Sequence, residues 1–326
     1  MKPAKVQNRS TKGDKIIQAL PVACADEPSA VAFMEAQRWG EDACCPRCGS
    51  VNVYQMKDNA TGERQKNFRW LCRDCKKAGD KCQYTVRTGT VFEDSKIELR
   101  HWCFAFWRAS TSKKGVSALE IHRQTGLSYK SCLFMLHRIR FAMAPADSNP
   151  LTGIVEVDET YVGGKPRRKA DGSGETVKSE KSIVVALVER GGQVRPKVVA
   201  DVTAATLHGA IRESVDSRAR IMTDEHVSYQ GIGQHFASHE TVKHSAYEYA
   251  RGDVTTNTVE GFFSILKRGL NGIYHSVSKE HLHRYLAEYE FRYNHRDLED
   301  GQRTLAAIKG AEGKRLMYKT PKGEVQ

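Results

Sequence analysis

The pattern of apolar and polar residues changes character near the middle of the chain. A helical pattern occupies about residues 96–143, whereas short runs rich in β-branched residues begin after residue 150. Pro145, Asn149 and Pro150 break the chain between the two patterns, so we place the main domain boundary there. A chain of 326 residues has room for about two domains.

Beyond this boundary, strand-like and helical patterns follow one another. We predict strands at 154–162, 183–188, 197–202 and 220–223, and helices at 204–215 and in two amphipathic segments that close the chain. The basic, glycine-containing stretch 163–181 is expected to form a flexible loop between two strands. Three neighbouring strands, a helix, a further strand and C-terminal helices predict a mixed α/β sheet.

The segment before the boundary has the pattern of a helix-turn-helix. Ser117 and Glu120 have the spacing of a capping box and predict a helix that ends near residue 124. Gly126 is expected to make the turn, and Ser128 can cap a second helix through about residue 143. This pattern indicates DNA binding, although a plain helical hairpin with a solvated basic face is the alternative.

The second helix of this pair should have two different faces. Its apolar residues recur at helical spacing and should face inward: Cys132, Leu136, Ile139 and Met143. Its polar residues should face solvent or a DNA groove: Tyr129, Lys130, His137, Arg138 and Arg140.

The charge balance narrows the class of partner. The chain has 51 basic and 39 acidic residues, a net charge of +12, which favours a polyanion such as nucleic acid or an anionic membrane surface. Residues 1–15 are polar and basic, and no apolar stretch behind them is long enough for a signal peptide or a spanning helix. We therefore expect a cytoplasmic protein that associates with DNA and not with a membrane.

Nine cysteines in a reducing compartment suggest metal binding rather than disulfides. Cys45 and Cys48 form one Cys-x-x-Cys pair, Cys72 and Cys75 form a second, and 23 residues separate the pairs. Four thiolates with this arrangement predict one structural Zn²⁺, because a closed tetrahedral site has no open position for catalysis. We interpret the remaining cysteines, Cys44 and Cys82 among them, as thiols that do not bind the metal.

Acidic residues interrupt a run that otherwise has the composition of a buried strand. Asp158 lies within Ile-Val-Glu-Val-Asp-Glu-Thr-Tyr, and such a conflict between burial and charge often marks a functional site. Glu156 should point to the same face as Asp158, and Glu159 to the opposite face. Asp224 follows the strand predicted at 220–223, where a turn-forming aspartate is the simpler explanation and Glu225 is the alternative acid.

The helix around Glu260 carries the most informative pattern. One face is apolar, with Val259, Phe262, Phe263, Leu266 and Leu270. The other is a polar ridge formed by Asn257, Glu260, Ser264 and Lys267. A solvated face is the ordinary explanation for such a ridge, but 35 residues separate Asp224 from Glu260, and Lys267 follows seven residues later.

Several motifs occur in order between Cys45 and about Arg296. They are Cys45-Pro-Arg-Cys48-Gly-Ser, Arg87-Thr-Gly-Thr-Val-Phe, Lys114-Gly-Val-Ser, Val157-Asp-Glu-Thr-Tyr-Val-Gly-Gly-Lys165, Thr256-Asn-Thr-Val-Glu-Gly-Phe-Phe-Ser-Ile-Leu-Lys-Arg268 and Phe291-Arg-Tyr-Asn-His-Arg296. Together they resemble the DDE superfamily of transposases and retroviral integrases, and more closely the bacterial insertion-sequence transposases with an N-terminal zinc ribbon. One departure is Thr255, where that family often has histidine.

The resemblance implies a ribonuclease-H-like α/β catalytic domain preceded by a zinc ribbon and a helix-turn-helix. It implies that Asp158, Asp224 and Glu260 hold two Mg²⁺ or Mn²⁺ ions, that Lys267 contacts DNA near the cut, and that Asn257 orients the glutamate or a phosphate. The expected DNA contacts are Lys130, Arg138, Lys165, Arg167, Arg168 and Arg268. The implied partners are the terminal inverted repeats, target DNA and further copies of the chain.

On this basis we divide the chain into five segments: an N-terminal extension (1–43), a zinc ribbon (44–86), a helix-turn-helix segment (87–150), the catalytic domain (151–300) and a C-terminal tail (301–326). Two other functions stay open. A nuclease of the same fold would hydrolyse but not join strands, and the N-terminal DNA-binding modules argue against it. An inert DNA-binding regulator should have lost one of the three acids, yet all three are present.

Overall fold

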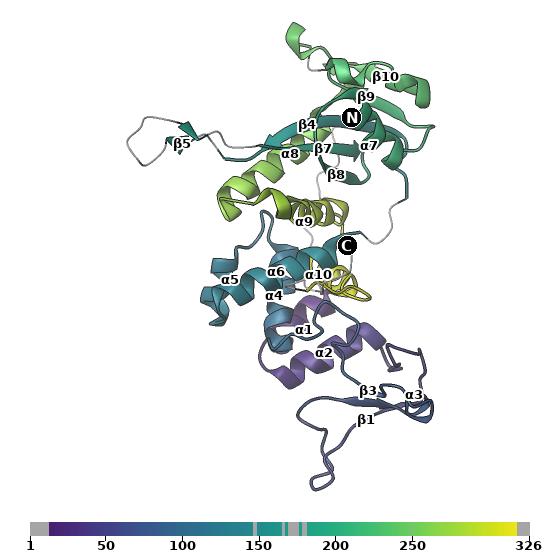
Figure 1. Cartoon of the computed structure of the whole chain (residues 1–326), viewed down its shortest axis with the longest axis vertical. Coiled ribbons are helices and arrows are strands. Elements are labelled where there is room, and N and C mark those ends of the chain that lie inside the picture. Colours follow the sequence, from purple (N-terminus) through teal and green to yellow (C-terminus); the bar gives the residue numbers. More distant parts are fainter. Residues whose placement is uncertain are drawn as a thin grey trace. The chain divides into compact units, whose positions relative to one another are not determined.

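The computed structural model describes residues 13–145, 149–164, 167–168, 176–177, 181–248 and 250–317, with the backbone alone at 167–168 and 176–177. The chain divides into two compact units (Figure 1). Unit 1 contains the described residues up to Met143 and again from Leu298 onward, and unit 2 runs from Ala144 to Asp297. The division at Met143 lies beside the chain break expected at Pro145.

Unit 1 is a set of helices that also carries the small cysteine-containing sheet. Its helices are α1 (Lys15–Ala23), α2 (Glu27–Trp39), α3 (Arg73–Lys77), α4 (Leu99–Thr111), α5 (Ala118–Thr125), α6 (Tyr129–Met143) and α10 (Asp300–Lys309). Its antiparallel sheet has the order β1 (Val53–Gln55), β2 (Trp70–Cys72) and β3 (Gln83–Tyr84). The apolar residues of α4 are buried because α1, α2, α6 and α10 all contact it.

The helix-turn-helix prediction is confirmed in its local details. The Ser117 side chain accepts a hydrogen bond from the Glu120 N–H and caps α5. Gly126 ends α5 with a φ of 72°, a conformation that glycine adopts without steric cost. Ser128 Oγ then accepts the N–H of Ser131 at the start of α6.

Helix α6 is buried on more sides than its polar residues suggested. The expected inward residues Cys132, Leu136, Ile139 and Met143 are buried, and so are His137, Arg138 and Arg140. The Arg138 guanidinium donates hydrogen bonds to the backbone carbonyls of Val91, Glu93 and Leu316. The expectation that Arg138 faces solvent or DNA is therefore wrong, because α4, α5 and α10 pack around the helix. Lys130, in contrast, is exposed.

Unit 2 is built on a five-stranded mixed sheet. Its strands are β4 (Ile154–Val162), β7 (Ser182–Glu189), β8 (Val194–Val199), β9 (Arg220–Thr223) and β10 (Ser238–Thr241), in the order β10-β9-β4-β7-β8. Its helices are α7 (Ala204–Ser214), α8 (Asn257–Gly269) and α9 (Leu282–Asn294), and short two-stranded pairs form between β5 (Arg167–Arg168) and β6 (Thr176–Val177) and between β11 (Ala250–Arg251) and β12 (Val254–Thr255).

The strand directions confirm the expected mixed α/β fold. Strands β4, β7 and β8 run antiparallel through successive hairpin pairs, whereas β9 and β10 are parallel to β4. This is the ribonuclease-H-like sheet that the motifs implied. Strand β8 lies three residues earlier than expected, at Val194–Val199, and β10 was missed because its four residues are all half-buried and none is a large apolar side chain.

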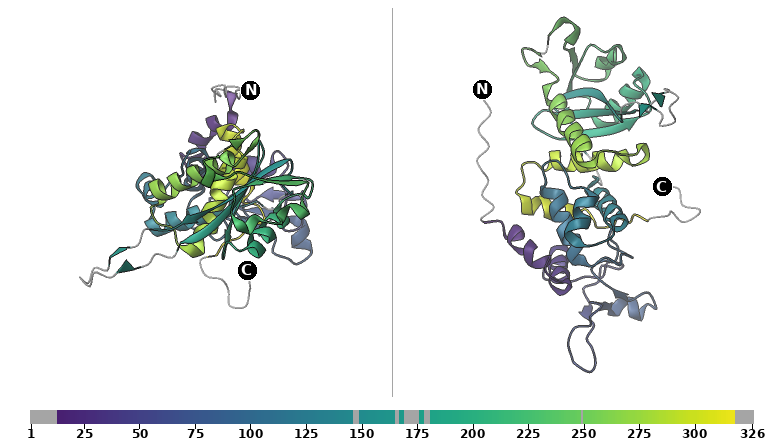
Figure 2. Two further views of the ribbon diagram at one scale, coloured as in Figure 1. Left: turned by 90° about the horizontal axis from the view of Figure 1, so that it is seen from above. Right: turned by 90° about the vertical axis from the view of Figure 1, so that its left-hand side faces the viewer.

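The two faces of the sheet have separate cores, and this sets where the acidic residues of β4 point. Val155 and Val157 pack with α7, whereas Ala186 and Val188 pack with α8 and α9. Figure 2 shows α8, in light green, against the sheet. Because Asp158 pairs with Ala186 and Glu156 with Val188, both acids lie on the α8 face, as expected from the alternation of a strand.

Candidate active site and zinc site

The sheet register brings two of the predicted acids side by side. Strand β4 pairs in parallel with β9, with Ile154 opposite Arg220 and Glu156 opposite Met222. Two residues beyond this pair, Asp158 of β4 is level with Asp224, which directly follows the end of β9. Neighbouring strands are only about 4.8 Å apart, so the register places both carboxylates at one point of the sheet.

Negative charge gathers around Asp158. Its side chain is half-buried, and that burial is the first cause that raises its pKa, to about 7. The neighbouring carboxylates of Glu159, Asp224 and Glu260 raise the pKa further, while the Glu159 N–H, which donates to Asp158 Oδ1 at 2.8 Å, opposes the shift. Asp224 and Glu260 are therefore close enough to act on Asp158 electrostatically, although they come from other elements of the fold.

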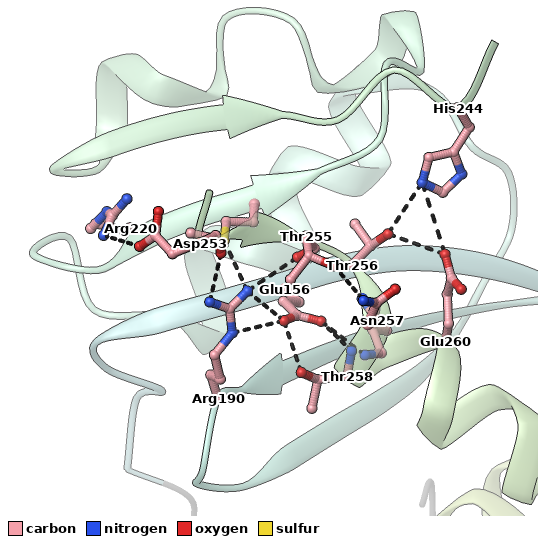
Figure 3. Close-up of polar contacts among 12 residues, drawn as sticks. Glu156, Arg190, Arg220, His244, Asp253, Thr255, Thr256, Asn257, Thr258 and Glu260 are labelled. Carbon is pink, nitrogen blue, oxygen red and sulfur yellow. Dashed lines mark hydrogen bonds and ion pairs between the residues drawn. The ribbon is translucent and has the colours of Figure 1, made fainter. Parts of the chain in front are cut away.

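Glu260 reaches this place from the first turn of α8. The helix has the predicted two faces, since Val259, Phe262, Phe263, Leu266 and Leu270 are buried and Asn257, Glu260, Ser264 and Lys267 are exposed. The Thr256 hydroxyl donates to Glu260 Oε1 at 3.2 Å (Figure 3). Thr255, the one noted departure from the motifs, accepts the Asn257 N–H through its hydroxyl at 3.1 Å and so helps to start the helix.

His244 is a neighbour of Glu260 that no sequence pattern indicated. It lies in a 3-10 turn, His244–Ala246, and its Nε2 is 3.9 Å from Glu260 Oε1 and 3.5 Å from the Thr256 hydroxyl (Figure 3). Periodicity could not identify it, because the turn belongs to neither a regular strand nor a long helix.

Hydrogen bonds separate Asp224 from the alternative acid beside it. Both carboxylate oxygens of Glu225 accept backbone N–H groups, from His244 at 2.6 Å and Ser245 at 2.8 Å. Those bonds lower the pKa of Glu225 and hold the turn at His244. Asp224 accepts a single backbone bond, from His226 at 3.0 Å. The contacts therefore favour Asp224 over Glu225 as the acid beside Asp158.

Glu159 lies on the other face of the sheet from Asp158. Its carboxylate accepts a hydrogen bond from the hydroxyl of Tyr229, which is buried in the core under α7. Burial and the adjacent Glu159 carboxylate both raise the pKa of Tyr229, so the phenol keeps its proton. Glu159 is thus engaged with the core of the α7 face.

The predicted DNA contacts are only partly covered by the structure. Lys267 and Arg268 are exposed on α8, where Lys267 lies seven residues, about two turns, beyond Glu260 on the same ridge. Lys165 and the side chains of Arg167 and Arg168 lie outside the described residues.

The two Cys-x-x-Cys pairs form a second, separate cluster in unit 1. The sulfur atoms of Cys45, Cys48, Cys72 and Cys75 all lie within 4.8 Å of one another. Gly49 has a φ of 74° and donates its N–H to the Cys45 carbonyl at 2.9 Å, which closes the first turn. Four convergent sulfurs are the ligand set of a structural zinc ion.

The surroundings favour the thiolate form of Cys72, whereas a hydrogen bond with Cys48 raises the pKa of Cys75. Burial opposes the ionisation of Cys72, but hydrogen bonds from backbone N–H groups at Cys75 and Asp74 lower the pKa of Cys72 to about 7. Trp39 of α2 packs on the same cluster, 5.6 Å from Trp70 between ring centroids. A side chain of α2, ahead of the first cysteine, therefore completes the small core around the sulfurs.

The acidic cluster is more open than the cysteine cluster. Within the described ranges, the four cysteines are the one group of three or more potential metal ligands whose atoms all lie within 4.8 Å. Asp158, Asp224 and Glu260 interact electrostatically across a wider space. Their carboxylate oxygens are the hard donors that Mg²⁺ and Mn²⁺ prefer, so the donor chemistry fits such ions.

Comparison with known proteins gives matches to both parts of the chain. Residues 150–294 match the family model described as the ISXO2-like transposase domain, and residues 25–78 match the transposase zinc-ribbon domain. In the described part of the chain, no helix combines the length and apolar character needed to cross a bilayer.

Two relatives agree with these matches. A Halobacterium salinarum protein, described as an uncharacterized protein in transposable element ISH50, is 28% identical over 280 residues, which cover 82% of this chain and 90% of that protein. An uncharacterized transposase-like protein of Haemophilus influenzae is 33% identical over 101 residues, which cover 31% of this chain and 80% of that protein.

Proposed function

Because the chain belongs to the family of ISXO2-like transposases with a zinc ribbon, we propose that it binds insertion-sequence ends and catalyses metal-dependent cleavage and transfer of DNA strands. The observation that carries the proposal is the acidic cluster. The β4–β9 register aligns Asp158 with Asp224, and Glu260 approaches from α8 closely enough to raise the pKa of Asp158.

The reaction consists of two displacements at phosphorus. In the first, water attacks a phosphodiester and a DNA 3′ hydroxyl leaves; in the second, that hydroxyl attacks target DNA and displaces another 3′ oxygen. Two bound Mg²⁺ or Mn²⁺ ions would activate the nucleophile and neutralise charge on the attacking and leaving oxygens. Asp158, Asp224 and Glu260 would hold these ions.

Exposed polar residues of α8 would position the DNA. Lys267 would contact a phosphate near the cut, Arg268 would add a second phosphate contact, and Asn257 would orient Glu260 or a phosphate oxygen. Lys165, Arg167 and Arg168 would clamp phosphates. Such contacts neutralise backbone charge, so DNA affinity should fall steeply as salt is raised.

Unit 1 would recognise the DNA ends. The four cysteines would hold one zinc ion, and Lys130, exposed at the start of α6, would contact DNA at the helix-turn-helix. Copies of the chain would assemble on DNA to bring two ends together.

The decisive experiment uses Asp158→Asn. Purified protein with Mg²⁺ and labelled DNA carrying the terminal repeats should cleave and join strands, and this variant should lose both reactions while it still binds DNA. Glu213→Gln is the matched control, since Glu213 is an exposed carboxylate of α7 that pairs with Lys197. An unchanged rate for Asp158→Asn would refute the assignment, and cleavage without joining would identify a nuclease instead.

A further inference from the structure

Glu156 is a buried acid that the proposed chemistry does not use. It lies two residues before Asp158 on the same face of β4, and its side chain is completely buried. An ionised carboxylate in the interior is costly unless charged and hydrogen-bonding partners surround it. The identity of those partners shows what Glu156 does.

One group of partners belongs to the start of α8. The backbone N–H groups of Thr258 and Val259 donate to Glu156 Oε2 at 2.7 and 3.1 Å, and the Thr258 hydroxyl donates to Oε1 at 2.8 Å (Figure 3). These are the N–H groups that the side chain of a capping residue normally satisfies. Thr256, which occupies the capping position, makes no such bond, so Glu156 of β4 caps the helix in its place. Its negative charge also suits the positive end of the helix dipole.

The other partner is Arg190, which directly follows β7. Its Nε and Nη2 donate to Glu156 Oε1 at 2.9 and 2.7 Å. The same guanidinium donates to the backbone carbonyls of Asp253 and Thr255, just before α8, and lies 3.2 Å from the sulfur of Met222 on β9 (Figure 3). Arg190 therefore touches β4, β9 and the segment that leads into α8.

The three acids lie on, or directly beyond, the elements that this pair connects. Strand β4 carries Asp158, β9 leads into Asp224, and Glu260 lies one residue beyond Val259 in α8. The side chain of Thr256, the capping residue of α8, makes no capping hydrogen bond. Bonds to Glu156 and Arg190 therefore anchor the first turn of α8, which carries Glu260.

We propose that the Glu156–Arg190 pair is a positioning device that holds the Glu260 carboxylate in register with Asp158 and Asp224 for divalent-metal binding. This inference rests on the proposed function, since it concerns the metal affinity of the same three acids. Glu156 itself does not bind the metal, because its two oxygens already accept five hydrogen bonds.

The test measures Mn²⁺ binding to the zinc-loaded, full-length protein by electron paramagnetic resonance, which follows the free ion without any need for activity. Glu156→Gln removes the charge and leaves one acceptor oxygen for five donors. Groups that orient metal ligands typically change affinity 10–100-fold, so we expect the apparent Kd for Mn²⁺ to rise at least tenfold. DNA affinity should change less than twofold, and high Mn²⁺ should restore part of the cleavage rate.

Glu288→Gln is the matched control. Glu288 is also buried in unit 2 and accepts hydrogen bonds from Tyr274 and Arg292, but it lies on α9, which carries none of the three acids. This variant should lose stability and keep the Mn²⁺ affinity of the wild type. If both glutamine variants lost Mn²⁺ affinity equally, general destabilisation would explain the effect and the positioning role would be wrong.

Two more variants separate the possible failures. Arg190→Lys keeps the charge, but a lysine cannot reach all the acceptors, so this variant should also weaken Mn²⁺ binding. It provides the test if Glu156→Gln does not fold. Normal Mn²⁺ affinity in the folded variants overturns the positioning role. Asp158→Asn should abolish Mn²⁺ binding at the acidic site. If it does not, the proposed function fails, and the positioning role fails with it.

Discussion

The acidic residues of unit 2 have different roles, and the hydrogen bonds that each carboxylate accepts distinguish these roles. Glu156 caps α8, Glu159 binds Tyr229 and Glu225 holds the turn at His244, whereas Glu260 is exposed on its ridge. Only the acids whose oxygens are not fully used by the fold are available for metal and DNA. The surrounding donors, rather than the residue type, therefore define the candidate site.

Arg138 and Lys130 are two basic residues of α6, of which the first is buried and the second exposed. Arg138→Met should destabilise unit 1 by about 3 kcal/mol, because three buried carbonyls lose a charged donor. Lys130→Ala, at an exposed position, should change stability by less than about 0.5 kcal/mol and weaken DNA binding. Urea denaturation and a DNA-binding titration measure the two effects. Normal stability for Arg138→Met would mean that its carbonyl contacts contribute little.

At the scale of elements, local pattern and tertiary contact have separate roles. The apolar stripe of α8 specified its buried face, and the β-branched run at Ile154–Val162 coincides with β4. The cap of α8 comes instead from a strand about 100 residues earlier, so no local pattern could indicate it. In the ribbon, likewise, the core under the cysteines is completed by Trp39 of α2.

The ribbon gives a prediction about metal removal. Elemental analysis should find about one zinc per chain, and a chelator should unfold the ribbon because four thiolates would lose their common ion. Cys72→Ser should lose the zinc. Cys82→Ser should keep it, since the Cys82 sulfur is not one of the four that converge. Retention of zinc by Cys72→Ser would exclude this ligand set.

At the scale of the whole molecule, the two compact units do not follow the order of the chain. Residues from Leu298 onward return to unit 1, where α10 contacts α1, α2, α4 and α6. Asp14, which caps α1, also accepts the N–H of Gly301 at 2.8 Å. The segment after residue 300, expected as a tail, thus contains a helix that packs into unit 1.

This arrangement predicts the result of truncation. A chain that ends at residue 297 should have a destabilised unit 1, by at least about 3 kcal/mol, because the buried Ala307 and Ile308 of α10 are lost. The fragment 144–297 should still fold, since it keeps both cores of the sheet. Thermal unfolding followed by circular dichroism measures both. An unchanged melting profile for the truncated chain would contradict the assigned role of α10.

Features that depend on local spacing could be predicted from the amino-acid sequence. Hydrophobic period located β4, β9 and α8, the cysteine spacing identified the sulfur cluster, and acids in apolar surroundings marked Asp158. Which side chains already have hydrogen-bonding partners or are buried became visible in the folded chain alone. It buried Arg138, placed His244 beside Glu260 and joined Glu156 to α8. The physical reason is that burial and hydrogen bonding depend on neighbours far away in the chain, whereas a period of two or 3.6 residues reports only on residues close in sequence.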